Sequence, residues 1–169
     1  MLRAAGADSR ELDLVRVADL RIPITGFGNV SQRDAVQLVN TLTRAAAAWP
    51  RPELRFAGSA ALEWPGDECV WARLDGDVDG VLTIGRGVPP AVKRLGFLVD
   101  RRAFRPWMAV GSITEHTTAP FLEHLVAELD EFKGTMWTLS TIAIMRKVPL
   151  DDSGAVEEVV LDLVPLGSD

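Results

Sequence analysis

The chain has 169 residues, of which 47% are hydrophobic and 25% charged, which is enough to bury a core in one domain or in two small lobes. It has no apolar run near the ~18 residues that span a bilayer and no hydrophobic secretory segment, so we expect a cytoplasmic protein with no membrane partner. Residues 1–150 hold 18 acidic and 18 basic side chains, and residues 151–169 add six acidic ones, so this tail supplies the whole net charge of −6. Long duplex nucleic acid is therefore a poor partner, because no overall positive field attracts phosphates, but a small local phosphate site is compatible with this balance.

The first half of the chain is predicted to contain a strand, a helix and two strands, over residues 20–27, 31–49, 54–64 and 68–75. Ser31, followed three residues later by Asp34, is close to a capping box and predicts the start of the helix. The sequence Pro65-Gly66-Asp67 predicts the turn between the two strands.

The second half repeats this order. We predict a strand, a helix and a hairpin closed around Asp151–Gly154, over residues 104–113, 118–132, 134–148 and 155–165. Between the halves we predict a helical connector that is interrupted by Gly85, Gly87 and Pro89-Pro90. The chain is thus predicted as a single domain, residues 1–169, with lobe 1 over about 12–76, the connector over 77–97 and lobe 2 over about 98–166.

A duplicated β-α-β-β chain predicts an α+β fold with two antiparallel sheets facing a central cleft and with helices outside. The first strands of the two halves then face each other, and alternate side chains on them point to opposite sides. The side chains predicted to face the core are Ile22, Ile24, Met108 and Val110. Those predicted to face the cleft are Arg21, Pro23, Thr25, Trp107, Ala109 and Gly111.

Two stretches carry a family resemblance: DLRIPITGFGNV, from Asp19 to Val30, and Phe104-Arg105-Pro106-Trp107-Met108-Ala109-Val110. With the duplicated order of elements, they resemble the two-histidine phosphoesterase superfamily, specifically the LigT-like group called 2'-5' RNA ligases or RNA 2',3'-cyclic phosphodiesterases. The resemblance covers about residues 12–166 and implies a LigT-like fold. It also implies phosphoester chemistry in which one histidine deprotonates the attacking water or hydroxyl, another protonates the leaving oxygen, and neighbouring hydroxyls hold the phosphate.

The four positions at which this family carries its catalytic residues are substituted here. The family histidines fall on Arg21 and Trp107, and their hydroxyl partners fall on Pro23 and Ala109. A guanidinium stays protonated at physiological pH, and an indole has no acid–base chemistry near neutrality. We therefore expect a catalytically inactive member, a pseudoenzyme, for which we assign no catalytic residue and no cofactor.

The other reactive side chains of the sequence are poor candidates to replace the two missing histidines. His116 begins a His-x-Thr sequence, but it lies nine residues beyond the family position and is predicted to occupy a polar turn before a helix. His124 is predicted to lie on the outer face of that helix beside Glu128. Cys69, the single cysteine, has no disulfide partner and is predicted to be a strand residue. No pair of histidines has ligand spacing, so no metal site is predicted.

Positive charge and aromatic surface remain at the predicted cleft. We predict that a nucleotide or RNA phosphate end is bound by Arg21, Thr25, Arg105, Trp107 and Ser112. The two arginines would hold a phosphate through forked hydrogen bonds, and Trp107 would stack on a base. The simpler alternative is that Trp107 and Arg21 only fill the space of the missing histidines. The nearby basic residues Lys93, Arg94, Arg101 and Arg102 lie close in sequence, and we predict a solvated loop for the last two.

Two other functions stay open. One is an active hydrolase of the RNA 2',3'-cyclic phosphodiesterase type with relocated groups such as Thr25, Ser112 and His116. The other is a non-catalytic module for protein interaction or homodimer formation. About eighteen residues precede Leu20, and residues 9–18 accommodate one short strand at best, so we expect a sheet edge able to pair with another chain.

Overall fold

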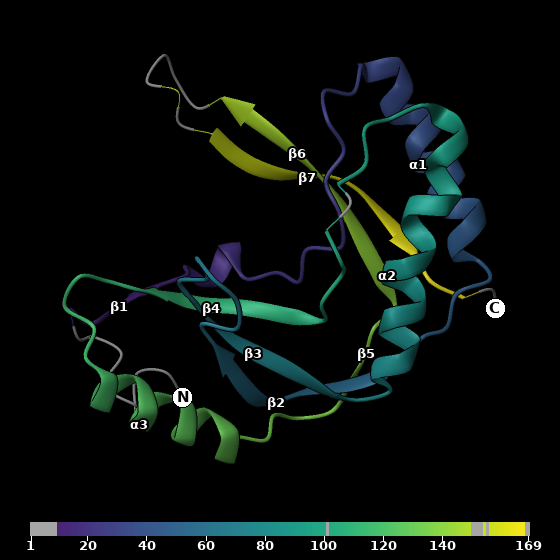
Figure 1. Ribbon diagram of the computed structural model, residues 1–169. Helices are drawn as coiled ribbons and strands as arrows, with labels where there is room; N and C mark the ends of the chain where they lie inside the picture. Colours follow the sequence, from purple (N-terminus) through teal and green to yellow (C-terminus); the bar gives the residue numbers. More distant parts are fainter. Residues whose placement is uncertain (1–9, 101, 150–153, 155, 168–169) are drawn as a thin grey trace. The chain divides into compact units, whose positions relative to one another are not determined.

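The computed structural model describes residues 10–100, 102–149, 154 and 156–167 (Figure 1). The chain divides into two compact units, and each is described by itself. Unit 1 comprises Met1–Ile24, Glu53–Val78 and Arg105–Trp137, and unit 2 comprises Thr25–Pro52, Asp79–Phe104 and Thr138–Asp169. Each unit therefore combines segments from both halves of the sequence, whereas the predicted lobes follow the sequence order.

Unit 1 is built on a five-stranded sheet in the order β1-β4-β3-β2-β5, with α3 packed against one face (Figure 1). The pairs β1–β4, β4–β3 and β3–β2 are antiparallel. Its elements are β1 (Leu12–Leu14), the 3-10 helix η1 (Val17–Asp19), β2 (Glu53–Ala61), β3 (Cys69–Gly76), β4 (Trp107–Ile113), α3 (Ala119–Glu131) and the start of β5 (Trp137–Thr138). The core between α3 and the sheet consists of Leu12, Val70, Ala72, Val110, Leu125 and Leu129.

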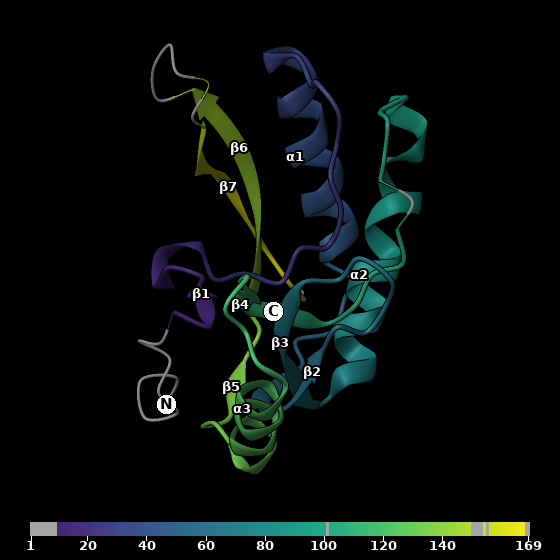
Figure 2. The same cartoon turned by 60° about the vertical axis from the view of Figure 1, so that its left-hand side comes forward.

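Unit 2 contains α1 (Gln32–Ala46), nearly all of α2 (Val78–Val92), the 3-10 helix η2 (Lys93–Leu95) and the two-stranded antiparallel sheet of β6 (Thr141–Pro149) and β7 (Val156–Pro165). Figure 2 shows α1 beside β7, and these two elements are in contact. The face of α1 that is buried carries Leu38, Leu42 and Ala46, which are spaced by four residues. The predicted cap is confirmed, because Ser31 Oγ accepts a hydrogen bond from the Asp34 N–H at 3.2 Å.

The predicted strand over residues 20–27 is wrong. Residues 20–26 have no regular secondary structure, and Phe27 forms only an isolated bridge. Pro23 has no N–H to donate to a neighbouring strand, so it disfavours a continuous ladder at this position. Residues 26–28 are instead attached to residues 98–100 by two backbone hydrogen bonds of 2.9 and 3.1 Å. The second sheet is therefore a two-stranded ribbon.

The predicted interruption of the connector is also wrong, because α2 is one continuous helix that includes Pro89 and Pro90. The two glycines before these prolines serve close packing. A Cβ on Gly85 would collide with the Phe104 ring, and one on Gly87 would lie 2.9 Å from Nε1 of Trp49. The lower helix propensity of glycine is thus compensated by the close approach of two aromatic rings.

The other predicted elements are confirmed with small shifts at their ends, except that the strand expected over residues 134–148 is divided. Its first part, β5, joins the five-stranded sheet, and β6 begins only at Thr141. The expected short strand near residues 9–18 is β1, which lies at the edge of its sheet. The hairpin residues Asp151–Ser153 lie outside the described residues. No helix in the described ranges combines the length and the apolar character needed to cross a membrane.

A bulge in β2 is held by α3. The register between β2 and β3 shifts between Phe56 and Ser59, and Gly58 in this interval has a φ of 78°. Ser59 is only 6% exposed, and its main-chain N–H and its hydroxyl each donate to Oδ1 of Asp130, both at 2.8 Å. One carboxylate oxygen therefore satisfies the buried polar groups of the bulge.

We expect Asp130→Ala to lower the free energy of unfolding by about 1–3 kcal/mol, because it leaves the buried Ser59 N–H without its acceptor. Urea unfolding measures this loss. The neighbouring exposed Glu131→Ala on the same helix is the matched control and should change stability by less than about 0.5 kcal/mol. Equal stability of the two variants would contradict this role of Asp130.

Candidate functional site

The candidate site lies on the face of the unit 1 sheet opposite α3. Met108 of β4 packs against the α3 core, so Trp107 and Ala109 point to the other face. On β3, Trp107 pairs with Arg73 and Ala109 pairs with Trp71. Paired residues share a face of an antiparallel sheet, and the four side chains therefore lie together.

Three indoles and two guanidiniums meet on this face and form what we call the tryptophan–arginine cluster: Trp64, Trp71, Arg73, Arg105 and Trp107. The ring centroid of Trp71 lies 5.7 Å from that of Trp64 and 6.4 Å from that of Trp107. The guanidinium carbon of Arg105 is 4.2 Å from the Trp64 centroid and 5.2 Å from the Trp107 centroid. Arg73 stands 5.0 Å from the Trp107 centroid. All these distances lie within the range of cation–π or aromatic pairing.

Asp67 holds the turn that carries Trp64. Its carboxylate is 8% exposed and accepts hydrogen bonds from the Glu63 N–H at 3.0 Å, the Cys69 N–H at 3.1 Å and Nε1–H of Trp71 at 3.0 Å. The predicted turn is confirmed: the Asp67 N–H donates to the Trp64 carbonyl at 2.9 Å, and Gly66 takes the positive φ of 81° that this turn requires. One buried carboxylate thus fixes both the turn and the ring of Trp71.

The cluster retains cationic edges that can bind an anion. Arg73 Nη2 lies 3.4 Å from Oε1 of Glu63, in a partly exposed pair. Arg105 is exposed, and no carboxylate in the described ranges lies within ion-pair distance of it. Because the indoles cover the faces of a guanidinium, its N–H groups stay directed along the edge, where a phosphate or carboxylate accepts them.

Arg21, the other predicted phosphate ligand, is placed in the irregular segment before unit 2 begins. Its Nη2 lies 3.7 Å from Oδ1 of Asp19, and its side chain is 36% exposed. Arg16 Nε donates to the second oxygen of the same carboxylate at 2.6 Å. That Arg21 and Arg105 bind the same phosphate group of a ligand stays a prediction.

The two predicted hydroxyl ligands fall in different units. Thr25 belongs to unit 2, where its hydroxyl donates to the Asp100 carbonyl at 3.2 Å. Ser112 belongs to β4 and pairs with Cys69, and a register shift lies between Val70 and Trp71 of the partner strand. This shift keeps Ser112 on the face that carries Ala109, since one residue of β4 is bulged between them.

The remaining reactive side chains are those of His116, His124 and Cys69. His116 occupies the turn before α3, as predicted, with Nε2 3.8 Å from Oε1 of Glu115, and His124 is exposed on α3. Cys69 is the first residue of β3, and burial together with the charges of Asp67 and Glu68 raises the pKa of its thiol. The described residues contain no group of three or more His, Cys, Asp and Glu side chains that is arranged to hold a metal ion.

The predicted solvated loop is confirmed for Arg102, whose side chain is 90% exposed and lies 2.7 Å from Asp100. The hydrogen bond between these side chains lowers the pKa of Asp100 and raises that of Arg102. Lys93 and Arg94 are exposed on η2, and Arg101 lies outside the described residues.

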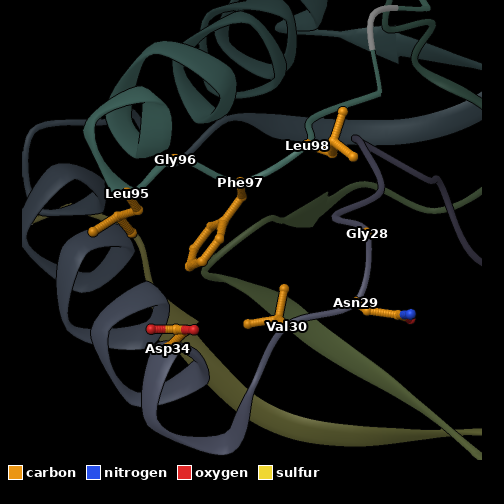
Figure 3. A pocket seen from close by; sticks show the side chains of 8 residues that line it. All are labelled: Gly28, Asn29, Val30, Asp34, Leu95, Gly96, Phe97 and Leu98. Carbon is orange, nitrogen blue, oxygen red and sulfur yellow. The ribbon is translucent and has the colours of Figure 1, made fainter.

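A separate hollow of about 330 Å³ lies within unit 2, beside the N-terminus of α1 (Figure 3). Its lining residues are Gly28, Asn29, Val30, Asp34, Leu95, Gly96, Phe97 and Leu98. Figure 3 shows the Phe97 ring directed toward Val30 and Asp34. Because the Asp34 carboxylate already accepts the Ser31 hydroxyl at 2.7 Å and brings negative charge to this helix end, the hollow does not favour a phosphate.

No protein-family model matches the chain, and no curated protein matches it in sequence. Solved structures do match. TT0787 of Thermus thermophilus is similar with a TM-score of 0.72 and 16% identity, over 99% of this chain and 89% of that chain. E. coli LigT complexed with 3'-AMP is similar with a TM-score of 0.67 and 15% identity, over 92% and 81%, and LigT complexed with NADP+ with 0.70 and 13%, over 99% and 89%. The chain therefore has a LigT-like α+β fold, which confirms the predicted fold class.

Sequence reasoning identified Arg105 and Trp107 but missed three members of the cluster. Trp71 and Arg73 are two residues apart in a predicted strand, so they share a face, and this alternation could have revealed them. Trp64 is the last residue of the predicted strand over 54–64, but β2 ends at Ala61 and Trp64 stands in the turn, so strand alternation does not give its direction.

We expect Asp67→Ala to lower the free energy of unfolding by at least about 2 kcal/mol, because three N–H donors lose a buried charged acceptor. The change should also shift tryptophan emission to longer wavelength, since the ring of Trp71 loses its anchor. Urea unfolding followed by fluorescence measures both. The control is Glu68→Ala, which removes an exposed neighbouring carboxylate. If Asp67→Ala and Glu68→Ala have the same free energy of unfolding and the same emission wavelength, Asp67 does not have the anchoring role.

Proposed function

We propose that this protein is a LigT-like member of the two-histidine phosphoesterase superfamily that binds a nucleotide or an RNA phosphate end on the tryptophan–arginine cluster without hydrolysing it. The observation that carries the proposal is the setting of Trp107. The family resemblance aligns this residue with a catalytic histidine, and in the structure it lies against Arg73 and Arg105. A proton-exchanging group is thus replaced by a stacking surface flanked by two cations.

The loss of hydrolysis follows from the chemistry of the substituted positions. Neither Arg21 nor Trp107 exchanges protons near neutral pH, and each missing general catalyst costs about 10²–10⁴ in rate. The relocated groups do not supply a replacement pair. His116 stands in an exposed turn, where its backbone N–H donates to Oγ1 of Thr114 at 3.1 Å, and the Thr25 hydroxyl is engaged by Asp100.

Binding is supported by the shape and charge of the cluster. Trp107 offers an aromatic face for a base, and Arg105 offers N–H groups for phosphate oxygens without a competing carboxylate among the described residues. The similar structures of E. coli LigT are complexes with 3'-AMP and with NADP+, and both ligands are nucleotides. A nucleotide or RNA end is therefore the ligand class that we propose.

The first prediction of this proposal is the absence of turnover. Purified protein incubated with 2',3'-cyclic AMP should give no ring-opened product above the buffer background, measured by chromatography. Turnover that disappears in His116→Ala but persists in His124→Ala, the second histidine of the chain, would contradict the proposal and favour relocated catalysis.

The second prediction concerns binding of 3'-AMP. Calorimetry should detect binding that weakens with salt, and Arg105→Ala should reduce the affinity about tenfold or more, because a charge-assisted hydrogen bond is worth about 1.5–3 kcal/mol. Arg21→Ala should have a similar effect if Arg21 shares the phosphate as the sequence predicts. Arg102→Ala removes the same charge from an exposed pair with Asp100 and is the matched control. If Arg105→Ala leaves the affinity unchanged, or if Arg102→Ala lowers it by the same factor, the proposed site is wrong.

A further inference from the structure

The Arg105 guanidinium lies over the rings of two indoles, and a single stacking surface on Trp107 does not account for the second contact. Its guanidinium carbon is within 4.2 Å of the Trp64 centroid and within 5.2 Å of the Trp107 centroid. A guanidinium is a flat, delocalised group with the thickness of an aromatic ring. Both indoles therefore already contact the same planar group.

The backbone of Trp64 is anchored although its side chain is partly exposed. Trp64 is 36% exposed at the first position of the turn between β2 and β3, and its carbonyl accepts the Asp67 N–H of that turn. Its ring also lies 5.7 Å from the ring of Trp71, which Asp67 anchors through Nε1. An aromatic side chain that already packs against a neighbouring ring loses less conformational entropy when a ligand stacks on it than a free one does.

Arg105 is the movable member of the cluster. It is exposed, its recorded contacts are the two indole faces, and no carboxylate in the described part of the chain pairs with it. Arg73, by contrast, is tied to Glu63 and stands on a strand. Because an exposed cation–π contact is weaker than a charge-assisted hydrogen bond to phosphate, a phosphorylated ligand favours release of Arg105 from the indoles.

We propose that Trp64 and Trp107 form a two-sided stacking slot for a purine base, and that Arg105 fills the slot until the base displaces its guanidinium, which then binds the phosphate of the same ligand. This inference rests on the proposed function and adds the class of base and the role of Trp64. Stacking on both faces rewards the larger bicyclic surface of a purine over a pyrimidine. Trp64 is therefore a specificity-determining residue that acts on the base, while Arg105 acts on the phosphate.

The test compares 3'-AMP, 3'-UMP and unphosphorylated adenosine by calorimetry against the intact protein, Trp64→Leu and Arg105→Ala. The intact protein should bind 3'-AMP about tenfold or more tightly than 3'-UMP. Trp64→Leu should reduce binding of 3'-AMP by a similar factor and abolish the preference over 3'-UMP. Trp64→Phe should retain part of the preference, and Trp137→Phe, whose ring packs with Phe56, is the control for loss of an indole elsewhere in unit 1.

The Arg105→Ala variant separates displacement from simple loss of contact. It should weaken the binding of 3'-AMP, because the phosphate of 3'-AMP loses the Arg105 guanidinium. It should strengthen the binding of adenosine, because adenosine no longer competes with a guanidinium for the slot. If the affinity for adenosine falls or stays unchanged in Arg105→Ala, the proposal that the base displaces Arg105 is wrong. If the preference for a purine survives in Trp64→Leu, the proposal that the base stacks on Trp64 is wrong. In both cases the proposed function stands if 3'-AMP binding still requires Arg105, whereas absence of binding by all three ligands defeats both proposals.

Discussion

The buried carboxylate of Asp67 is the group on which the arrangement of the tryptophan–arginine cluster depends. A buried charge is tolerated only when it is fully hydrogen-bonded, and Asp67 meets this condition with two main-chain N–H groups and one indole N–H. These bonds fix the hairpin turn and the direction of Trp71 together. Because Trp71 touches both Trp64 and Trp107, the position of one ring limits the positions of the other two.

Arg105 differs from Arg55 and Arg102 in the groups that its guanidinium contacts. Arg55 donates to Asp75 at 2.7 Å, and this hydrogen bond lowers the pKa of that carboxyl, as the Arg102 side chain does for Asp100. Exposed pairs of this kind contribute little to stability, and they leave their cations neutralised. Arg105 has aromatic faces in place of a carboxylate, so its charge stays available to a ligand. The distinction between these arginines lies in their partners and not in their exposure.

Local patterns predicted most of the fold, since the alternation of β4, the cap at Ser31 and the turn before Asp67 are encoded within a few residues. The errors have two causes. Within residues 20–27, Pro23 disfavours the strand that hydrophobic alternation favours, whereas α2 continues through its glycines because the distant residues Phe104 and Trp49 pack on them. In the site, Trp107 was predicted from its strand register, whereas the direction of the Trp64 side chain was not predicted, because Trp64 stands in the turn and outside the alternating part of the strand.

The proposed function treats recognition of a phosphate and transfer of a proton as two separable properties of a site. An indole is only a hydrogen-bond donor and a guanidinium keeps its proton, so a phosphodiester in such a site meets favourable charge but no base for the attacking oxygen. Recognition depends on which way the side chains point, and β4 still directs positions 107 and 109 to the face opposite α3. The pleat of a strand fixes the directions of its side chains whatever their chemistry is, and for this reason a shared fold supports a proposal about the place of a ligand better than one about a reaction.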